Sequence, residues 1–190
     1  MGFLDSILGR GKAPVKASAD RLFAMSTAGI TLEASQSITT RGAAALVFQP
    51  LATGDFRTVL EEVEGILRGT GEETGSTIDT HEDAHGYRWM IIRDPDLEDL
   101  VVGLNSVMGS LETSGYADRV LCAVFAFEDE RGTALYFIYN AKRGTWYPFV
   151  PVAAEKRDSE REMQLRAALG TELPFEAQLE RWFPLWGIPI

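Results

Sequence analysis

Hydrophobic residues along this chain recur at two spacings, and each spacing predicts one type of secondary structure. Over residues 55–67 and again over 95–111, apolar side chains recur every three or four positions, as they do on one face of a helix. Asp94 or Asp96 is placed to cap the N-terminus of the second of these helices. Two further helices are predicted, over residues 18–25 and 159–169.

Strands are predicted where β-branched and aromatic residues gather between turn residues. In the first half of the chain these stretches are GITLEA (29–34) and AAALVFQPL (43–51), and GTGEETGS (69–76) is predicted to be a flexible acidic loop. In the second half, YRWMIIRD (87–94) is a predicted strand. It precedes a meander of three strands with short turns, RVLCAVFAFED, TALYFIYNA and TWYPFVPV.

This order of elements, which lacks repeated βαβ units, predicts an α+β fold. We expect a single domain over residues 17–190, with an antiparallel β-sheet and flanking helices. A chain of 190 residues, 45% of them hydrophobic, is long enough to bury about 70% of its unfolded surface. No stretch approaches the roughly 20 apolar residues that cross a bilayer, and we recognise no cleavable signal.

Residues 1–16 form a separate feature, a short amphipathic segment followed by the Gly- and Pro-containing link GRGKAPVK. The apolar residues at helical spacing are Phe3, Leu4, Ile7 and Leu8. Docking of this segment on its own domain is the favoured interpretation, because isolated short helices are marginal in water. The alternative is peripheral contact with a membrane or a partner through residues 3–16, which include Arg10, Lys12 and Lys16. MGFLDS also matches the eukaryotic N-myristoylation pattern.

The net charge of −10 is concentrated between Asp55 and Asp99, where thirteen acidic residues stand beside four arginines. Nucleic-acid binding depends on Lys and Arg that neutralise phosphates, so this charge argues against a DNA or RNA partner. The simpler interpretation is a solvated helix face plus an acidic loop. The more specific alternative is that this acidic region forms a binding surface for a basic protein partner.

Cys122 is the only cysteine and lies in the apolar run VLCAVFAF, which predicts a small core residue without a disulfide and fits a reducing cytoplasm. Apolar neighbours raise a thiol pKa, which argues against a catalytic nucleophile. The G-x-S-x-G and P-loop patterns are absent, and the many carboxylates lie where nothing desolvates them. We therefore expect no catalytic activity and no cofactor.

Residues 81–85 read HEDAH, which matches the zinc-peptidase pattern H-E-x-x-H. In that pattern His81 and His85 would bind zinc and Glu82 would act as general base. The pattern requires a helix, because only the i, i+4 spacing of a helix aims both imidazoles at one ion. The polar stretch before it and the glycine after it favour a solvated loop, so a zinc-dependent hydrolase is the alternative function. The third ligand would have to be one of Glu98, Asp99 and Glu112.

The chain ends on WFPLWGIPI, which is unusually aromatic for a terminus. We expect Trp182, Phe183 and Trp186 to pack against the sheet near Trp146, Tyr147 and Phe149, with GIPI along the rim. Closure of the core is the simpler interpretation, and a binding surface is the other, since Trp, Tyr and Arg dominate interfaces. The candidate partner-binding residues are Arg143, Trp146, Tyr147, Phe149, Arg181, Trp182, Phe183 and Trp186.

Four stretches taken together resemble the PspA-associated protein PspAB family of prokaryotes: MGFLDSILGR, YRW (87–89), KRGTWYPFVPV (142–152) and RWFPLWG (181–187). The resemblance runs over the whole chain. It implies a cytoplasmic protein of an envelope-stress setting, encoded near a PspA homologue and often near an HtpX-type membrane metallopeptidase. It implies no established catalytic activity and supplies no catalytic residues.

Two functional hypotheses follow. The first is a non-catalytic adaptor or chaperone-like regulator, cytoplasmic or peripheral at the inner face of the membrane. It would bind a protein partner, a PspA homologue or an HtpX-type peptidase, through its aromatic or acidic surface. The second is the zinc-dependent hydrolase at HEDAH.

Overall fold

The computed structural model describes residues 20–190, apart from the side chains of Asp20, Thr70 and residues 72–74. The amphipathic segment and link predicted over residues 1–16 lie outside the described residues. In chain order the elements are α1 (Asp20–Gln36), β1 (Ile38–Phe48), α2 (Gly54–Thr74), β2 (Thr77–Glu82), β3 (Arg88–Arg93), α3 (Leu97–Thr113), η2 (Ala117–Arg119), β4 (Val120–Asp129), β5 (Ala134–Asn140), β6 (Thr145–Phe149), β7 (Pro151–Ala153), β8 (Lys156–Arg157), α4 (Ser159–Leu169) and η3 (Leu179–Arg181).

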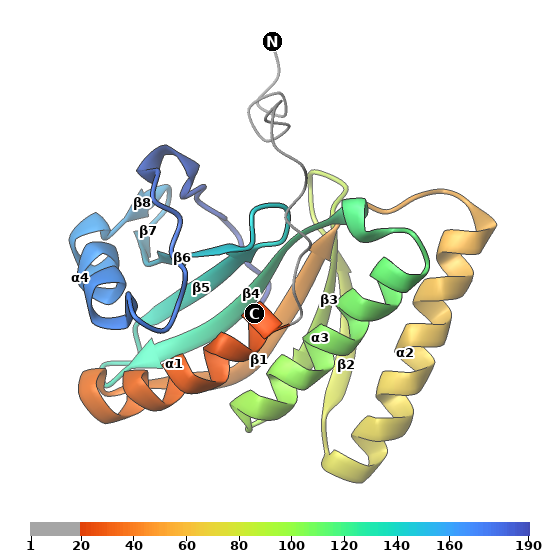
Figure 1. Ribbon diagram of the computed structural model, residues 1–190, viewed down its shortest axis with the longest axis horizontal. Helices are drawn as coiled ribbons and strands as arrows, with labels where there is room; N and C mark the ends of the chain where they lie inside the picture. Colours follow the sequence, from red (N-terminus) through yellow and green to blue (C-terminus); the bar gives the residue numbers. More distant parts are fainter. Residues whose placement is uncertain (1–19) are drawn as a thin grey trace.

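Six strands form one sheet in the order β2-β3-β1-β4-β5-β6, and every neighbouring pair is antiparallel (Figure 1). The short strands β7 and β8 form a separate hairpin beside α4. The predicted α+β fold, an antiparallel sheet with flanking helices, is thus confirmed. The predicted meander corresponds to β4, β5 and β6, and α4 has the predicted bounds.

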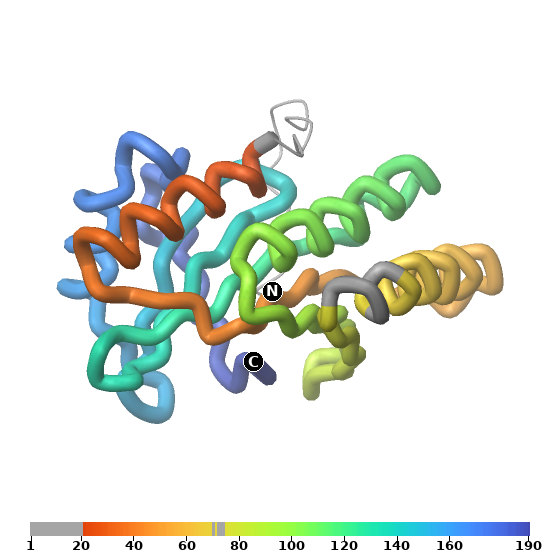
Figure 2. The backbone as a smooth tube through the Cα atoms, turned by 90° about the horizontal axis from the view of Figure 1, so that it is seen from below, coloured from red at the N-terminus to blue at the C-terminus, as the bar shows by residue number. Residues whose placement is uncertain are grey.

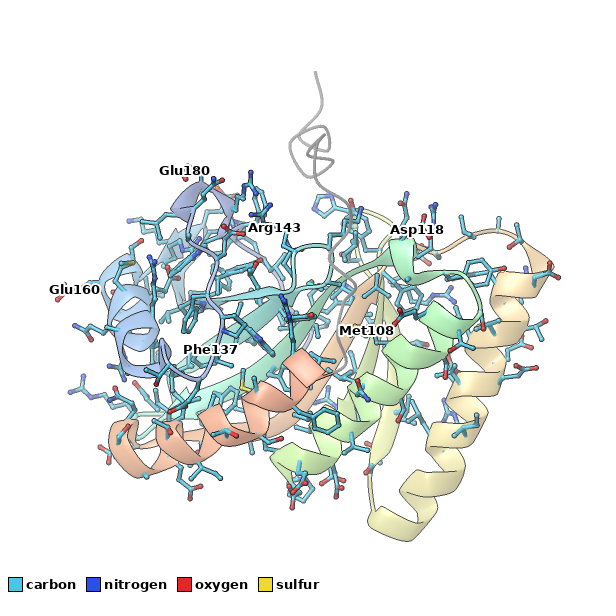
Figure 3. All side chains as sticks on the ribbon, viewed as in Figure 1. Met108, Asp118, Phe137, Arg143, Glu160 and Glu180 are labelled. Atoms are coloured by element: carbon cyan, nitrogen blue, oxygen red, sulfur yellow. The ribbon has the colours of Figure 1, made fainter. Side chains whose placement is uncertain are left out.

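One face of the sheet is covered by α1, α3 and α2, with α3 in the middle (Figure 1). The apolar residues of these helices pack against alternate residues of each strand, which makes the larger of two buried clusters. It includes the side chains of Met108 and Phe137, which Figure 3 labels. No helix in residues 20–190 is long and apolar enough to cross a membrane.

The other face of the sheet is covered by the end of the chain, residues 182–190. Figure 2 shows this C-terminal segment on the side of the sheet away from α1 and α3. The strand residues of opposite parity form the second buried cluster beneath it, together with Trp182. Both faces of the sheet are therefore apolar, which explains why the strands read as nearly continuous hydrophobic runs.

The stretch 29–34, predicted as a strand, is part of α1, so that prediction is wrong. Met25, Ala28 and Leu32 are buried at helical spacing, and Ile30 between them is 71% exposed. Gly29 lies against α3, since a Cβ there would come within 2.2 Å of Leu97 Cδ2 and the Leu97 side chain would have to move. Tertiary contact with α3 therefore outweighs the strand propensity of the local sequence.

The stretch 69–76, predicted as a loop, is mostly the last turns of α2, so that prediction is also wrong. Gly75 ends the helix with φ 90°, and its N–H donates to the Gly71 carbonyl at 2.7 Å. The glycines therefore mark a helix C-terminus. The strand β2 that follows was not predicted, because Ile78 is its only buried residue and no alternating pattern is visible.

The predicted helix over residues 95–111 begins two residues later, at Leu97, as α3. Asp96 is the N-cap, and its carboxylate accepts the N–H of Glu98 at 2.8 Å. Asp94 is buried and accepts the N–H of Asp96 at 2.8 Å and the hydroxyl of Ser76. Of the two predicted caps, only Asp96 caps α3. Asp94 instead ties the turn before α3 to Ser76 through its two hydrogen bonds.

Candidate partner-binding surfaces

Strand β6 carries three of the candidate aromatic residues, and the alternation of the strand divides them. Trp146 lies in the cluster on the helical face, where its Nε1–H donates to the Arg21 carbonyl at 3.3 Å. Tyr147 and Phe149 lie in the cluster on the opposite face. The expected packing of the tail is therefore correct for Tyr147 and Phe149 and wrong for Trp146, because successive strand residues point to opposite faces.

The two tryptophans of the C-terminal segment pack on that second face. Trp182 is 5% exposed, its ring stacks on Tyr147 with centroids 6.3 Å apart, and its Nε1–H donates to the Glu176 carbonyl at 3.0 Å. Trp186 meets Phe149 edge-on at 5.1 Å and stays 40% exposed. Trp182 is thus a core residue, and Trp186 lies at the surface.

The last residues of the chain also pack along this cluster. Ile188 and Ile190 are partly buried against it, and the Tyr136 hydroxyl donates to the Ile190 carbonyl at 3.1 Å. Burial raises the pKa of Tyr136. GIPI, expected along the rim, therefore contributes Ile188 and Ile190 to the packing on the second face of the sheet.

A buried ion pair joins the C-terminal segment to α4 and β6. The Glu162 carboxylate is 2% exposed and accepts the Arg157 Nε–H at 2.9 Å, and Arg157 Nη1 donates to the Trp182 carbonyl at 2.6 Å. The guanidinium also lies 5.2 Å from the centre of the Phe149 ring. Burial raises the pKa of Glu162, and the Arg157 hydrogen bond and the Val150 N–H oppose that shift.

A second ion pair fixes the chain just ahead of the C-terminal segment. Glu176 is buried and accepts hydrogen bonds from Arg143 and, at 3.0 Å, from the Gln178 N–H. Burial alone would raise the pKa of Glu176, but these hydrogen bonds outweigh it and the pKa lies below its ordinary value. In Figure 3, Arg143 and Glu180 lie at the end of the molecule away from α2.

The exposure of the eight candidate residues follows from these contacts. Four are buried in the sheet clusters: Trp146, Tyr147, Phe149 and Trp182. The four that reach solvent, fully or in part, are Arg143, Arg181, Phe183 and Trp186. An aromatic binding surface would therefore rest on Trp186 and its neighbours, and a partner-binding role for these residues stays a prediction.

The HEDAH stretch forms the end of β2 and the turn into β3. His81 and Glu82 are strand residues and His85 lies in the turn, so the helix that the zinc pattern requires is not formed. Asp83 organises the turn by accepting the Trp89 Nε1–H at 3.0 Å. Among the residues that the structure describes, no three His, Cys, Asp or Glu side chains are grouped to hold a metal ion.

Cys122 is buried in the second cluster, as predicted for a small core residue. Burial raises the pKa of its thiol to about 12. The thiolate is therefore a very small fraction at neutral pH.

The exposed carboxylates of the acidic region lie on α2, along β2 and at the start of α3. Glu64 and Glu82 have arginine partners, at 3.9 Å and 3.8 Å. Asp96, Glu98 and Asp99 lie within four residues at the start of α3, are exposed, and form no ion pair within the described part of the chain. The start of α3 therefore carries three exposed carboxylates without an ion-pair partner among the described residues.

A groove of about 360 Å³ opens beside this charge, between α1 and the start of α3. Its apolar lining comes mainly from Gly29 and Ile30 of α1, Leu97 of α3 and Phe127 of β4. Its acidic residues are Glu33, Asp96 and Glu98. We call it the acidic groove. Sequence reasoning missed its α1 side, because residues 29–34 were predicted to be a strand.

One of three comparisons with known proteins found a match, and it covers the whole chain. The family model for PspA associated protein B matches residues 1–190, which is the entire chain. Neither the search of curated proteins nor the search of solved structures returned a match. The chain therefore belongs to the PspAB family of PspA-associated proteins.

Proposed function

We propose that the protein is a non-catalytic interaction protein of the PspA-associated envelope-stress response. It binds a protein partner, with a PspA homologue as the first candidate because the family is described by its association with PspA. The partner segment is amphipathic and basic, and it occupies the acidic groove. An HtpX-type membrane peptidase is the second candidate partner.

The observation that carries this proposal is the combination of apolar lining and negative rim in one groove. Ile30 is the most exposed large hydrophobic residue of the described chain, at 71%. Glu33 and Glu98 are exposed beside it. A helix that presents apolar residues on one side and Lys or Arg at its margin is complementary to such a surface.

The test is binding of the purified PspA homologue from the same host to the immobilised full-length protein. The variant Glu33→Lys with Glu98→Lys reverses two charges of the groove. We expect it to bind at least tenfold more weakly than the wild type, and we expect wild-type binding to weaken as NaCl is raised.

The matched control is Glu61→Lys with Glu62→Lys, which makes the same charge change on exposed residues of α2 that do not line the groove. This control should bind as the wild type does. Equal loss in both variants would show that only net charge matters, and no loss in either would contradict the proposal. Trp186→Ala in the same assay tests the aromatic surface as the alternative.

A further inference from the structure

The acidic groove has three features that the described residues leave unmatched. Ile30 projects its apolar side chain into solvent at the edge. The Ser26 hydroxyl, which also lines the groove, is buried without a hydrogen-bond partner in the described chain. Glu33, Asp96 and Glu98 have no ion-pair partner there. A segment that fits the groove must therefore bring apolar side chains and positive charge.

The chain itself contains such a segment, ahead of the helix that forms one wall of the groove. Residues 3–8 have apolar side chains at helical spacing, and Arg10, Lys12 and Lys16 follow. The segment is therefore complementary to the groove, because its apolar residues match the apolar lining and the cations that follow match the unpaired carboxylates.

The connection is long enough for this contact. The groove residues of α1 begin at Ser26 and end at Glu33, about 9–20 Å along the helix from Asp20 at a rise of 1.5 Å per residue. Residues 9–19 can extend over at most about 40 Å. A segment on the same chain also has an effective concentration of about millimolar, so weak contacts suffice for docking.

We propose that residues 3–8 dock in the acidic groove of the same chain, with the basic residues 10–16 toward Glu33 and Glu98. The segment thereby covers the groove when no partner is bound and competes with the partner segment. The competition rests on the proposed function, whereas the docking does not.

Paramagnetic relaxation enhancement in the full-length protein tests the docking. At helical spacing, position 6 falls on the side opposite Phe3, Leu4, Ile7 and Leu8. The variant Ser6→Cys can therefore carry a nitroxide label without replacing or crowding these apolar residues. Cys122 is buried with a raised thiol pKa and stays unlabelled. We expect strong broadening of the Ile30 and Leu97 amide signals and none at Gly86 in the β2–β3 turn. Uniform weak broadening, or none, overturns the proposal.

Two exposed apolar residues provide a matched pair of variants. Ile30→Asp places a like charge in the acidic groove and should reduce the broadening at Leu97 at least fivefold. Val102→Asp makes the same kind of change on α3 at a residue that is 45% exposed and does not line the groove. It should leave the broadening unchanged. Equal effects of the two variants would contradict docking in the groove.

Two other occupants are distinguished in the same samples. Broadening in a mixture of labelled, isotopically unenriched chain with unlabelled ¹⁵N chain would identify a second copy and overturn the intramolecular contact. Absence of selective broadening, together with cosedimentation of the labelled protein with anionic phospholipid vesicles, would identify a membrane contact and also overturn it.

Competition is tested with the full-length variant Ile7→Ser with Leu8→Ser, which removes half of the apolar side chains. We expect it to bind the PspA homologue at least threefold more tightly than the wild type. Selective broadening with no change in affinity would leave the docking intact and refute the competition. Absence of binding to both proteins would refute the proposed function, and the competition with it, while the docking stands on the broadening alone.

Discussion

Replacing Arg157 by methionine leaves the Glu162 carboxylate buried without its cation. In the wild type the guanidinium binds that carboxylate through Nε at 2.9 Å and Nη2 at 2.8 Å, and Nη1 donates to the Trp182 carbonyl. Methionine keeps an unbranched apolar chain against Phe149 but offers no donor. One substitution therefore removes the hydrogen-bonded link between Glu162 of α4 and the Trp182 carbonyl, while the Arg166 guanidinium of α4 still lies 5.9 Å from the centre of the Trp182 ring.

The magnitude follows from burial. The Glu162 side chain is 2% exposed and that of Arg157 is 19% exposed. Removal of one partner from a buried pair costs about 3–5 kcal/mol, because the other charge stays uncompensated. For a chain of this size that corresponds to a decrease in melting temperature of about 6–20 °C. The double variant Arg157→Met with Glu162→Gln carries no buried charge and keeps an acceptor for the Val150 N–H, so most of the loss should be recovered.

The assay is urea unfolding followed by far-UV circular dichroism at pH 7 for the wild type, the single variant and the double variant. We expect the double variant to lie within about 2 kcal/mol of the wild type. A single variant within about 1 kcal/mol of the wild type would refute the reasoning, since an exposed pair contributes that little. A double variant no more stable than the single one would refute it as well.

Three further outcomes are expected from the structure. Cys122, with a thiol pKa of about 12 against an ordinary 9.0, should react with iodoacetamide at pH 8 about a thousandfold more slowly in the folded protein than in urea, measured by mass spectrometry. The pKa of Glu176 lies below its ordinary 4.5, so its stabilisation is present above about pH 4.5 and is lost as the pH falls through the folded-state pKa. The difference in unfolding free energy between the wild type and Glu176→Gln should therefore be larger at pH 7 than at pH 3. Trp182→Ala should cost about 3–5 kcal/mol of unfolding free energy and Trp186→Ala about 1 kcal/mol, because only the first is buried.

The sequence predicted those elements in which local pattern and tertiary packing agree. The strands β4, β5 and β6 combine β-branched and aromatic residues with short turns, and α4 follows Asp158, which caps it by accepting the Arg161 N–H at 2.9 Å. The covering of the second sheet face by the tail was predictable as well. Trp182 and Tyr147 are large aromatic residues, which folding most simply places in a core.

The elements that were mispredicted depend on contacts between distant parts of the chain. Gly29 signals a break in a local pattern, but in the fold it lies inside α1, in contact with the Leu97 side chain of α3. The edge strand β2 buries Ile78 alone, so no alternation was available to reveal it.

The acidic groove escaped prediction for the same reason. Ile30 and Glu98 are separated by almost seventy residues, and only the packing of α1 beside α3 brings them to one surface. The opposite orientations of Trp146 and Tyr147, by contrast, follow from the period of a strand and needed no structure.

Hydrogen–deuterium exchange of the full-length protein with and without the PspA homologue tests the central claim most directly. Binding in the acidic groove predicts new protection at residues 26–33 of α1 and 96–98 at the start of α3, with little change in the C-terminal segment. Protection confined to residues 179–190 would place the partner on the aromatic surface instead. Protection at neither site, with the partner bound, would contradict both surfaces and the account built on them.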